Sequence, residues 1–229
     1  MRRCLGWIPD EVLQHTLDHS TLLVKNHMRI PMRRHFQSRE PVLNRKRLGE
    51  VYATDTFFAE TSAQDGSTCA QLFTGCTSFF TRAFGMKKES EAPTALEDFC
   101  REIGVPTGIK SDNSKAQTSK RWKDICRKFC IGQKTTEPHH PQQNPAERRI
   151  RTVKQLALRL LDHCGAPRKM WIYALLLACA LLNVTSMSTL GNRTPYKVAF
   201  GEAPDISAYL QHQHMYSMSK VNILHVQHM

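Results

Sequence analysis

The chain has 229 residues, with 32 Lys and Arg against 20 Asp and Glu, which gives a formal net charge of +12 at pH 7. Its hydrophobic content of 41% is that of an ordinary globular domain and excludes a disordered or fibrous chain. The positive charge predicts a polyanionic partner, of which nucleic acid is the commonest. The longest apolar run, from Met170, is too short for a bilayer, which needs about 20 residues. An anionic membrane surface is the weaker alternative, because no basic amphipathic helix long enough to lie on a bilayer stands out, and we expect no membrane partner.

Residues 1–47 predict a basic arm rather than part of a core. A short helix fits residues 9–28, with Pro9 near its start, and prolines among dense positive charge favour an extended segment over 29–49. Two interpretations of this arm stay open: a solvated linker and a nucleic-acid contact.

Ordered structure is predicted to begin at Val51. The predicted elements are, in chain order, strands over 51–59, 67–74 and 77–84, a helix over 89–104, a strand over 105–112, a helix over 114–130, a strand over 131–138, and helices over 144–165 and 168–187. The first three strands are expected to form an antiparallel meander. This order predicts an α/β domain in which helices flank a mixed five-stranded sheet.

One acid is out of place in the first predicted strand. Asp55 shares a face with the apolar residues Val51, Ala53, Phe57 and Ala59. An isolated carboxylate in such a row is costly unless a cation or hydrogen bonds meet it. Asp55 is therefore a candidate for chemistry.

Two further acids lie at element boundaries. Asp112 ends the strand over 105–112, and ligands of α/β sheets collect at the carboxyl ends of strands. Taken alone, Asp112 is better explained as an N-cap of the helix that follows. Glu147 occupies the third position of a helix capped by Asn144, where a capping box also favours glutamate.

Taken together, the three acids favour a metal site. Two Asp and one Glu are the hard oxygen ligands that bind two Mg²⁺ or Mn²⁺ ions for phosphoryl transfer. Arg151 and Lys154 follow Glu147 by four and seven residues, so they lie on its helix face, where DNA phosphates would bind. A solvated helix face is the alternative for these two cations.

The chain also resembles a known family. The segments that carry the resemblance are "VYATDTFFA", "GIKSDN", "HHPQQNPAERRIRTVKQLALRLL", "WIYALLLACALLNVT" and "RTPYKVAFGEAPDIS". They resemble the catalytic core of copia-type retrotransposon integrases over about residues 48–207. Between Asp55 and Asp112 lie 56 residues, and between Asp112 and Glu147 lie 34, which is close to the spacing of the DDE integrases.

The resemblance implies an RNase H-like fold and a catalytic, metal-binding triad of Asp55, Asp112 and Glu147 with two Mg²⁺ or Mn²⁺ ions. It implies 3′-end processing and strand transfer of the DNA of an LTR retrotransposon by a homo-oligomer. It also implies four DNA-binding residues, which are Asn144, Arg148, Arg151 and Lys154. The domain division that follows is a basic arm over 1–47, a catalytic core over 48–207 and a divergent tail over 208–229.

Several departures from the family pattern leave alternatives open. Pro145 replaces the usual Gly after the Asn, and His15 and His19 have no paired cysteines to complete a zinc module. The chain is interpreted as a fragment of a larger polyprotein, and an inactive nucleic-acid-binding relic or an RNase H-type nuclease are the alternative functions. The eight scattered cysteines, with no signal peptide, predict free thiols and an intracellular place, nuclear or in a cytoplasmic particle.

Overall fold

The computed structural model describes residues 5, 8–20, 44–111, 114–135, 145–207 and 209. They belong to two compact units, one made of Met1–Arg33 with Asn183–Met229 and the other of Arg34–Leu182. Large parts of the predicted arm and tail lie outside the described residues. The division at 47 and 207 therefore stays a prediction.

The unit Arg34–Leu182 is built on a mixed five-stranded sheet in the order β3-β2-β1-β4-β5. The strands are β1 Val51–Phe58, β2 Cys69–Gly75, β3 Thr81–Met86, β4 Gly108–Ser111 and β5 Gly132–Thr135. The first three form an antiparallel meander, while β4 runs parallel to β1 and β5 parallel to β4. The predicted sheet is confirmed, and β1 lies at its centre.

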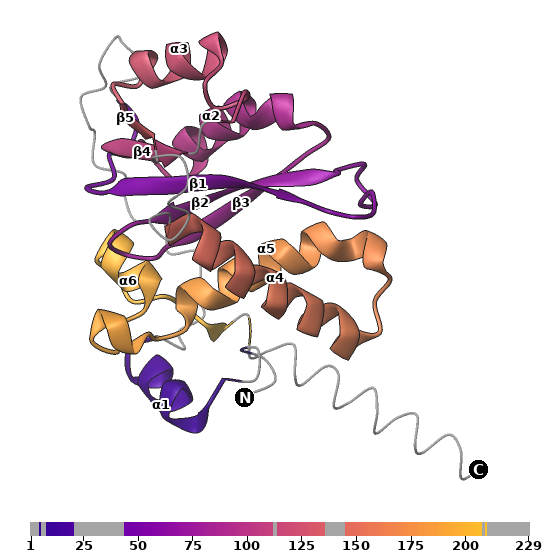
Figure 1. Cartoon of the computed structure of the whole chain (residues 1–229). Helices are drawn as coiled ribbons and strands as arrows, with labels where there is room; N and C mark the ends of the chain where they lie inside the picture. Colours follow the sequence, from indigo (N-terminus) through magenta and orange to yellow (C-terminus); the bar gives the residue numbers. More distant parts are fainter. Residues whose placement is uncertain are drawn as a thin grey trace. The chain divides into compact units, whose positions relative to one another are not determined.

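Helices cover both faces of this sheet (Figure 1). On one face lie α2 Ala92–Glu102, entered through the 3-10 turn η3 Glu89–Glu91, and α3 Lys120–Lys128. On the other lie α4 Pro145–Cys164 and α5 Trp171–Val184, joined through η5 Arg168–Met170. The predicted α/β architecture with flanking helices is confirmed.

An aromatic cluster joins the sheet to α2. Phe99 is fully buried, stacks on Phe73 of β2 at 4.6 Å between ring centroids, and packs against Tyr52 of β1 at 5.0 Å. Aromatic pairs in such offset or tilted arrangements stabilise a core beyond the area that they bury. This cluster anchors the α2 layer to the two central strands.

Apolar residues at helical spacing form the buried sides of α3 and α4, although Ile150 at the start of the α4 row is only half-buried. In α3 the inward residues are Trp122 and Ile125, followed by Phe129 at its end, and Ser119 caps the helix by accepting a hydrogen bond from the Trp122 N–H. In α4 the inward residues are Val153, Ala157, Leu160 and Leu161. Helical periodicity was therefore a sound guide to the packed faces.

The predicted strand over 77–84 is wrong at its start, because β3 begins only at Thr81. The carboxylate of Glu50 accepts hydrogen bonds from the backbone N–H groups of Thr77 and Ser78 and holds the chain in a turn. Phe79 takes a positive φ of 57° in this turn. The apolar pattern of these residues concealed a turn that a distant acid stabilises.

The second unit contains α1 Asp10–Asp18, η6 Ser188–Leu190 and α6 Pro195–Phe200. Thr16 of α1 is buried and accepts a hydrogen bond from the backbone N–H of Ser186 at 3.0 Å, while the Ser186 hydroxyl donates to the Val12 carbonyl. The predicted helix over 9–28 is confirmed over 10–18, and its residues 21–28 lie outside the described part. The beginning of the chain thus packs with the segment that follows α5.

Two further observations concern the described residues alone. None of their helices is both long and apolar enough to cross a membrane. Their cysteines are all free thiols, as predicted, and Cys4 is not among them.

Replacing Phe99 with Ala tests the aromatic cluster. We expect a loss of about 3–5 kcal/mol in the free energy of unfolding, because the substitution leaves a cavity beneath Tyr52 and Phe73. Urea denaturation measures this loss. Phe58→Ala is the control, because the Phe58 side chain is 59% exposed and its loss opens no cavity. Equal losses in the two variants would contradict the assignment of Phe99 to the core.

Candidate active site

Asp55 lies on the face of the sheet that α4 and α5 cover. Its neighbour on the same face of β1 is Phe57, whose ring is 5.5 Å from that of Trp171 in α5 and 5.5 Å from the Lys154 Nζ of α4. β1 pairs with β2 without a bulge from Tyr52 to Phe58, so the alternation carries back to Asp55. The Asp55 side chain is half-buried, and its Oδ1 accepts a hydrogen bond from the Thr56 N–H at 2.7 Å.

Glu147 lies in the first turn of α4 and is half-buried. Because α4 contacts β1 and β2, the start of this helix and Asp55 share one side of the sheet. β4, the parallel neighbour of β1, ends at Ser111, and the next residue, Asp112, lies outside the described residues. Asn144 is outside them as well.

The described part of the chain holds no group of three His, Cys, Asp or Glu side chains placed to bind one metal ion. The structure therefore places Asp55 and the helix of Glu147 on the same side of the sheet, and the complete triad stays a prediction.

The basic residues of α4 fall into two groups. Arg148, Arg151 and Lys154, which the sequence predicts as DNA-binding residues, are exposed. Arg149 is 7% exposed instead, and its Nε donates a hydrogen bond to the Thr81 hydroxyl at 3.0 Å. Two adjacent arginines thus point in different directions, and only the first is available to a ligand.

Burial dominates the electrostatics around Arg149. It lowers the pKa of the guanidinium to about 10, and the Arg149 Nη2 has no hydrogen-bond partner among the described residues. Burial also raises the pKa of the nearby Cys179 thiol to about 12, against the opposing effect of Arg149. At neutral pH a charged guanidinium therefore lies beside a neutral thiol, and no carboxylate of the described residues pairs with Arg149 to offset the cost of desolvation.

Two cations near the candidate site were missed at the sequence level. Lys110 of β4 pairs with Ala53 of β1 on one side and with Lys134 of β5 on the other. Residues in register share a face, so both lysines lie on the Asp55 side of the sheet. The sequence signal for Lys110 is its position two residues before Asp112, which places both on the same face of the strand. Only the pairing register of the strands shows that this face is the Asp55 side.

No protein-family model matches the chain, but comparison with known proteins gives relatives among Pol polyproteins. The chain is 31% identical over 84 residues to the Retrovirus-related Pol polyprotein from transposon RE2 of Arabidopsis thaliana, which is 36% of this chain and 6% of that polyprotein. It is 29% identical over 143 residues to the Gag-Pol polyprotein of Baboon endogenous virus (strain M7), covering 61% of this chain and 8% of the relative. The chain thus spans less than a tenth of either relative.

Among solved structures, the chain is similar to the HTLV-2 integrase catalytic core domain in complex with magnesium, in its trimeric form. The TM-score is 0.55 at 21% identity, and the match covers 66% of this chain and 96% of that one. The chain is therefore related to the Pol polyproteins of retroviruses and plant copia-type retrotransposons, and its fold is the RNase H-like fold of retroviral integrase cores.

Substituting Met for Arg149 tests the cost of its burial. The unfolded guanidinium keeps its proton to a higher pH than the folded one, so folding at any pH below about 10 includes the cost of burying the charge. Met fills a similar volume without that charge, and we expect an equal or higher free energy of unfolding in urea at pH 7. The exposed Arg151→Met is the control, with an expected change of less than about 0.5 kcal/mol. A clear destabilisation by Arg149→Met alone would show that the guanidinium makes a net stabilising contact.

Proposed function

We propose that this chain, with its integrase-core fold and its relationship to retrotransposon Pol polyproteins, is an integrase catalytic core that inserts retroelement DNA by metal-dependent polynucleotidyl transfer. One observation carries the proposal: Asp55 at the centre of β1 faces the same side of the sheet as α4, whose first turn contains Glu147. An acid on the central strand and an acid at the start of the covering helix suit a shared metal site.

In this proposal the three acids hold two Mg²⁺ or Mn²⁺ ions. Asp55 and Asp112 would hold the ions, and Glu147 would complete the ligand set. The donor set fits, since carboxylate oxygens are the ligands that these ions prefer, and Asp112 follows directly on β4, the strand beside β1. When bound, the ions stabilise the attacking and leaving oxygens of an in-line displacement at phosphorus.

The cations of the same side hold the DNA. Arg148, Arg151 and Lys154 are exposed on α4, and with Asn144 we assign them to the phosphates of the retroelement end. Lys154 lies over the Phe57 ring, which keeps its ammonium group beside the strand that carries Asp55. Lys110 and Lys134 extend this positive surface across β4 and β5.

The proposed reaction also indicates the oligomeric state of the protein and the place in the cell where it acts. Joining two DNA ends to a target favours a homo-oligomer, and the structure of the HTLV-2 core in complex with magnesium (trimeric form) supports both an oligomer and a divalent ion. We assign the activity to the nucleus or to a cytoplasmic particle that carries the element.

Replacing Asp55 with Asn, or Glu147 with Gln, tests the metal-binding role. We expect each change to abolish Mn²⁺-dependent strand transfer and disintegration on short DNA oligonucleotides, because each removes one anionic metal ligand. Duplex affinity should stay within about twofold, since it rests on the basic surface. Asp162→Asn is the matched control: it changes an exposed acid of the same helix and should leave activity unchanged.

The outcomes separate the candidate functions. A wild-type chain that binds DNA but catalyses nothing with Mg²⁺ or Mn²⁺ would favour an inactive relic of an integrase. Cleavage of RNA–DNA hybrids without strand transfer would favour an RNase H-type nuclease. A loss of DNA affinity in Asp55→Asn as large as its loss of strand-transfer activity would contradict the division between metal-binding and DNA-binding residues.

A separate substitution, Lys154→Gln, tests the DNA contact. We expect about a tenfold loss of affinity for a duplex carrying the element's end, or about 1.4 kcal/mol, because one phosphate contact is lost. Fluorescence anisotropy measures the affinity, and Lys154→Arg should restore most of it. Arg159→Gln changes an exposed cation farther along α4 and serves as the control. Equal losses of duplex affinity in Lys154→Gln and Arg159→Gln would show that only the net charge matters and that Lys154 makes no specific phosphate contact.

A further inference from the structure

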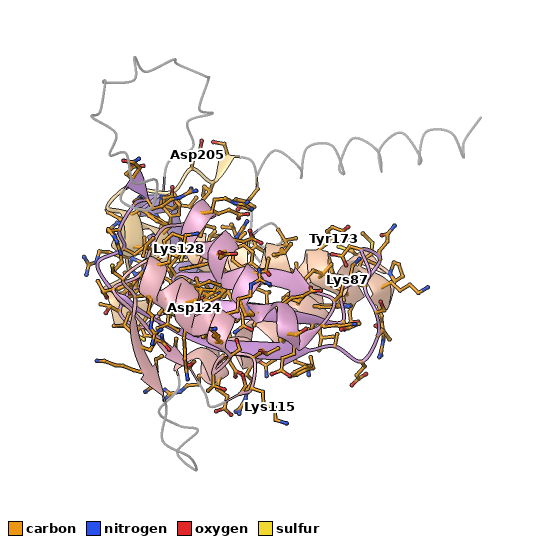
Figure 2. All side chains as sticks on the ribbon, turned by 90° about the horizontal axis from the view of Figure 1, so that it is seen from above. Lys87, Lys115, Asp124, Lys128, Tyr173 and Asp205 are labelled. Atoms are coloured by element: carbon orange, nitrogen blue, oxygen red, sulfur yellow. The ribbon has the colours of Figure 1, made fainter. Side chains whose placement is uncertain are left out.

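The outward side of α3 is a second concentration of positive charge. Its exposed residues include five cations and only one acid, Asp124; the cations are Lys120, Arg121, Lys123, Arg127 and Lys128. Figure 2 views the molecule from the α2 and α3 side and labels Asp124 and Lys128. The inward residues Trp122, Ile125 and Cys126 are buried against the core, so the exposed side carries no apolar residue.

Ion pairing leaves most of this charge available. Arg121 lies 3.7 Å from Glu97 and Arg127 lies 3.9 Å from Asp124, but these arginine side chains stay 61% and 81% exposed. Such exposed pairs are weak, and a polyanion can compete with them. No carboxylate among the described residues pairs with Lys120, Lys123 or Lys128.

This surface is distinct from the candidate active site. α3 packs with α2 on one face of the sheet, whereas α4, with Glu147 and Lys154, covers the other (Figure 1). A ligand on the outward side of α3 therefore does not occupy the surface that α4 presents. The observation stands whether or not the triad is catalytic.

We propose that the outward side of α3 binds the phosphate backbone of a second nucleic-acid segment, separate from the one held by α4. Protein interfaces need an apolar or aromatic centre and are depleted in lysine, whereas the exposed side of α3 carries five cations and no apolar residue. Nucleic-acid interfaces are polar and strongly positive, as this one is. The proposal goes beyond the active site, because one chain would then contact two stretches of nucleic acid.

The test is a charge reversal with a matched control in the full chain. Lys120→Glu/Lys123→Glu/Lys128→Glu changes the α3 surface, and Lys87→Glu/Lys88→Glu/Lys169→Glu makes the same change in net charge at three exposed lysines outside α3. Figure 2 shows Lys87 well away from Lys128. We expect at least about a tenfold loss of affinity for a mixed-sequence DNA duplex in the first variant and a much smaller loss in the second.

The salt dependence gives a second measurement. Loss of three phosphate contacts should make the slope of log affinity against log salt less steep by about 2–3 in the α3 variant, and by less in the control. The α3 variant should weaken only the segment bound at α3, and Lys154→Gln only the one bound at α4, because the two surfaces are separate. The α3 variant should still carry out disintegration of a short substrate. A failure of the α3 proposal can therefore be distinguished from a failure of the catalytic proposal.

Asp124→Asn provides a test that does not depend on the triple variant folding. It removes the one acid of α3, so we expect tighter duplex binding, whereas the matched Asp162→Asn on α4 should bind as the wild type does. Equal affinity of the two triple variants, or no gain in Asp124→Asn, would overturn the proposal. The wild type could also bind polyglutamate. If the α3 variant lost that binding but still bound the duplex as tightly as the wild type, the result would overturn the proposal in favour of an acidic protein partner.

Discussion

The central position of β1 is the constraint on which the rest of the structure depends. Strands pair with it on both sides, and helices cover both of its faces, so its alternating residues must satisfy two different layers. Tyr52 packs against Phe99 of α2, whereas Phe57 packs against Trp171 of α5. This alternation directs Asp55 toward the α4 side, where a half-buried carboxylate needs a cation or hydrogen bonds.

The positive charge of the chain is unevenly distributed, and its parts have different consequences. Arg148, Arg151 and Lys154 are exposed on α4, the cations of α3 are exposed on the other side of the sheet, and Arg149 is buried between α4 and the sheet. The net charge of +12 alone would treat all of these alike. Burial separates the cations that can meet a polyanion from the one that imposes a cost on folding.

Much of the fold was predictable because its local signals agree with its global packing. The meander, the mixed sheet and the inward stripes of α3 and α4 all followed from periodicity and turn residues. The start of β3 was not predictable, because a turn at Ser78 is held by Glu50, a residue 28 positions earlier. The pairing of Lys110 with Lys134 also escaped, since a parallel register is not written in either strand alone.

By itself, the sequence determined the order of the elements, the excess of positive charge and the acids Asp55, Asp112 and Glu147 as candidates, because each depends on residue type and local spacing. Only the tertiary structure decided which face Asp55 occupies relative to α4, and which of two adjacent arginines, Arg148 and Arg149, reaches solvent. The physical reason is that a face becomes inside or outside only when another element packs against it.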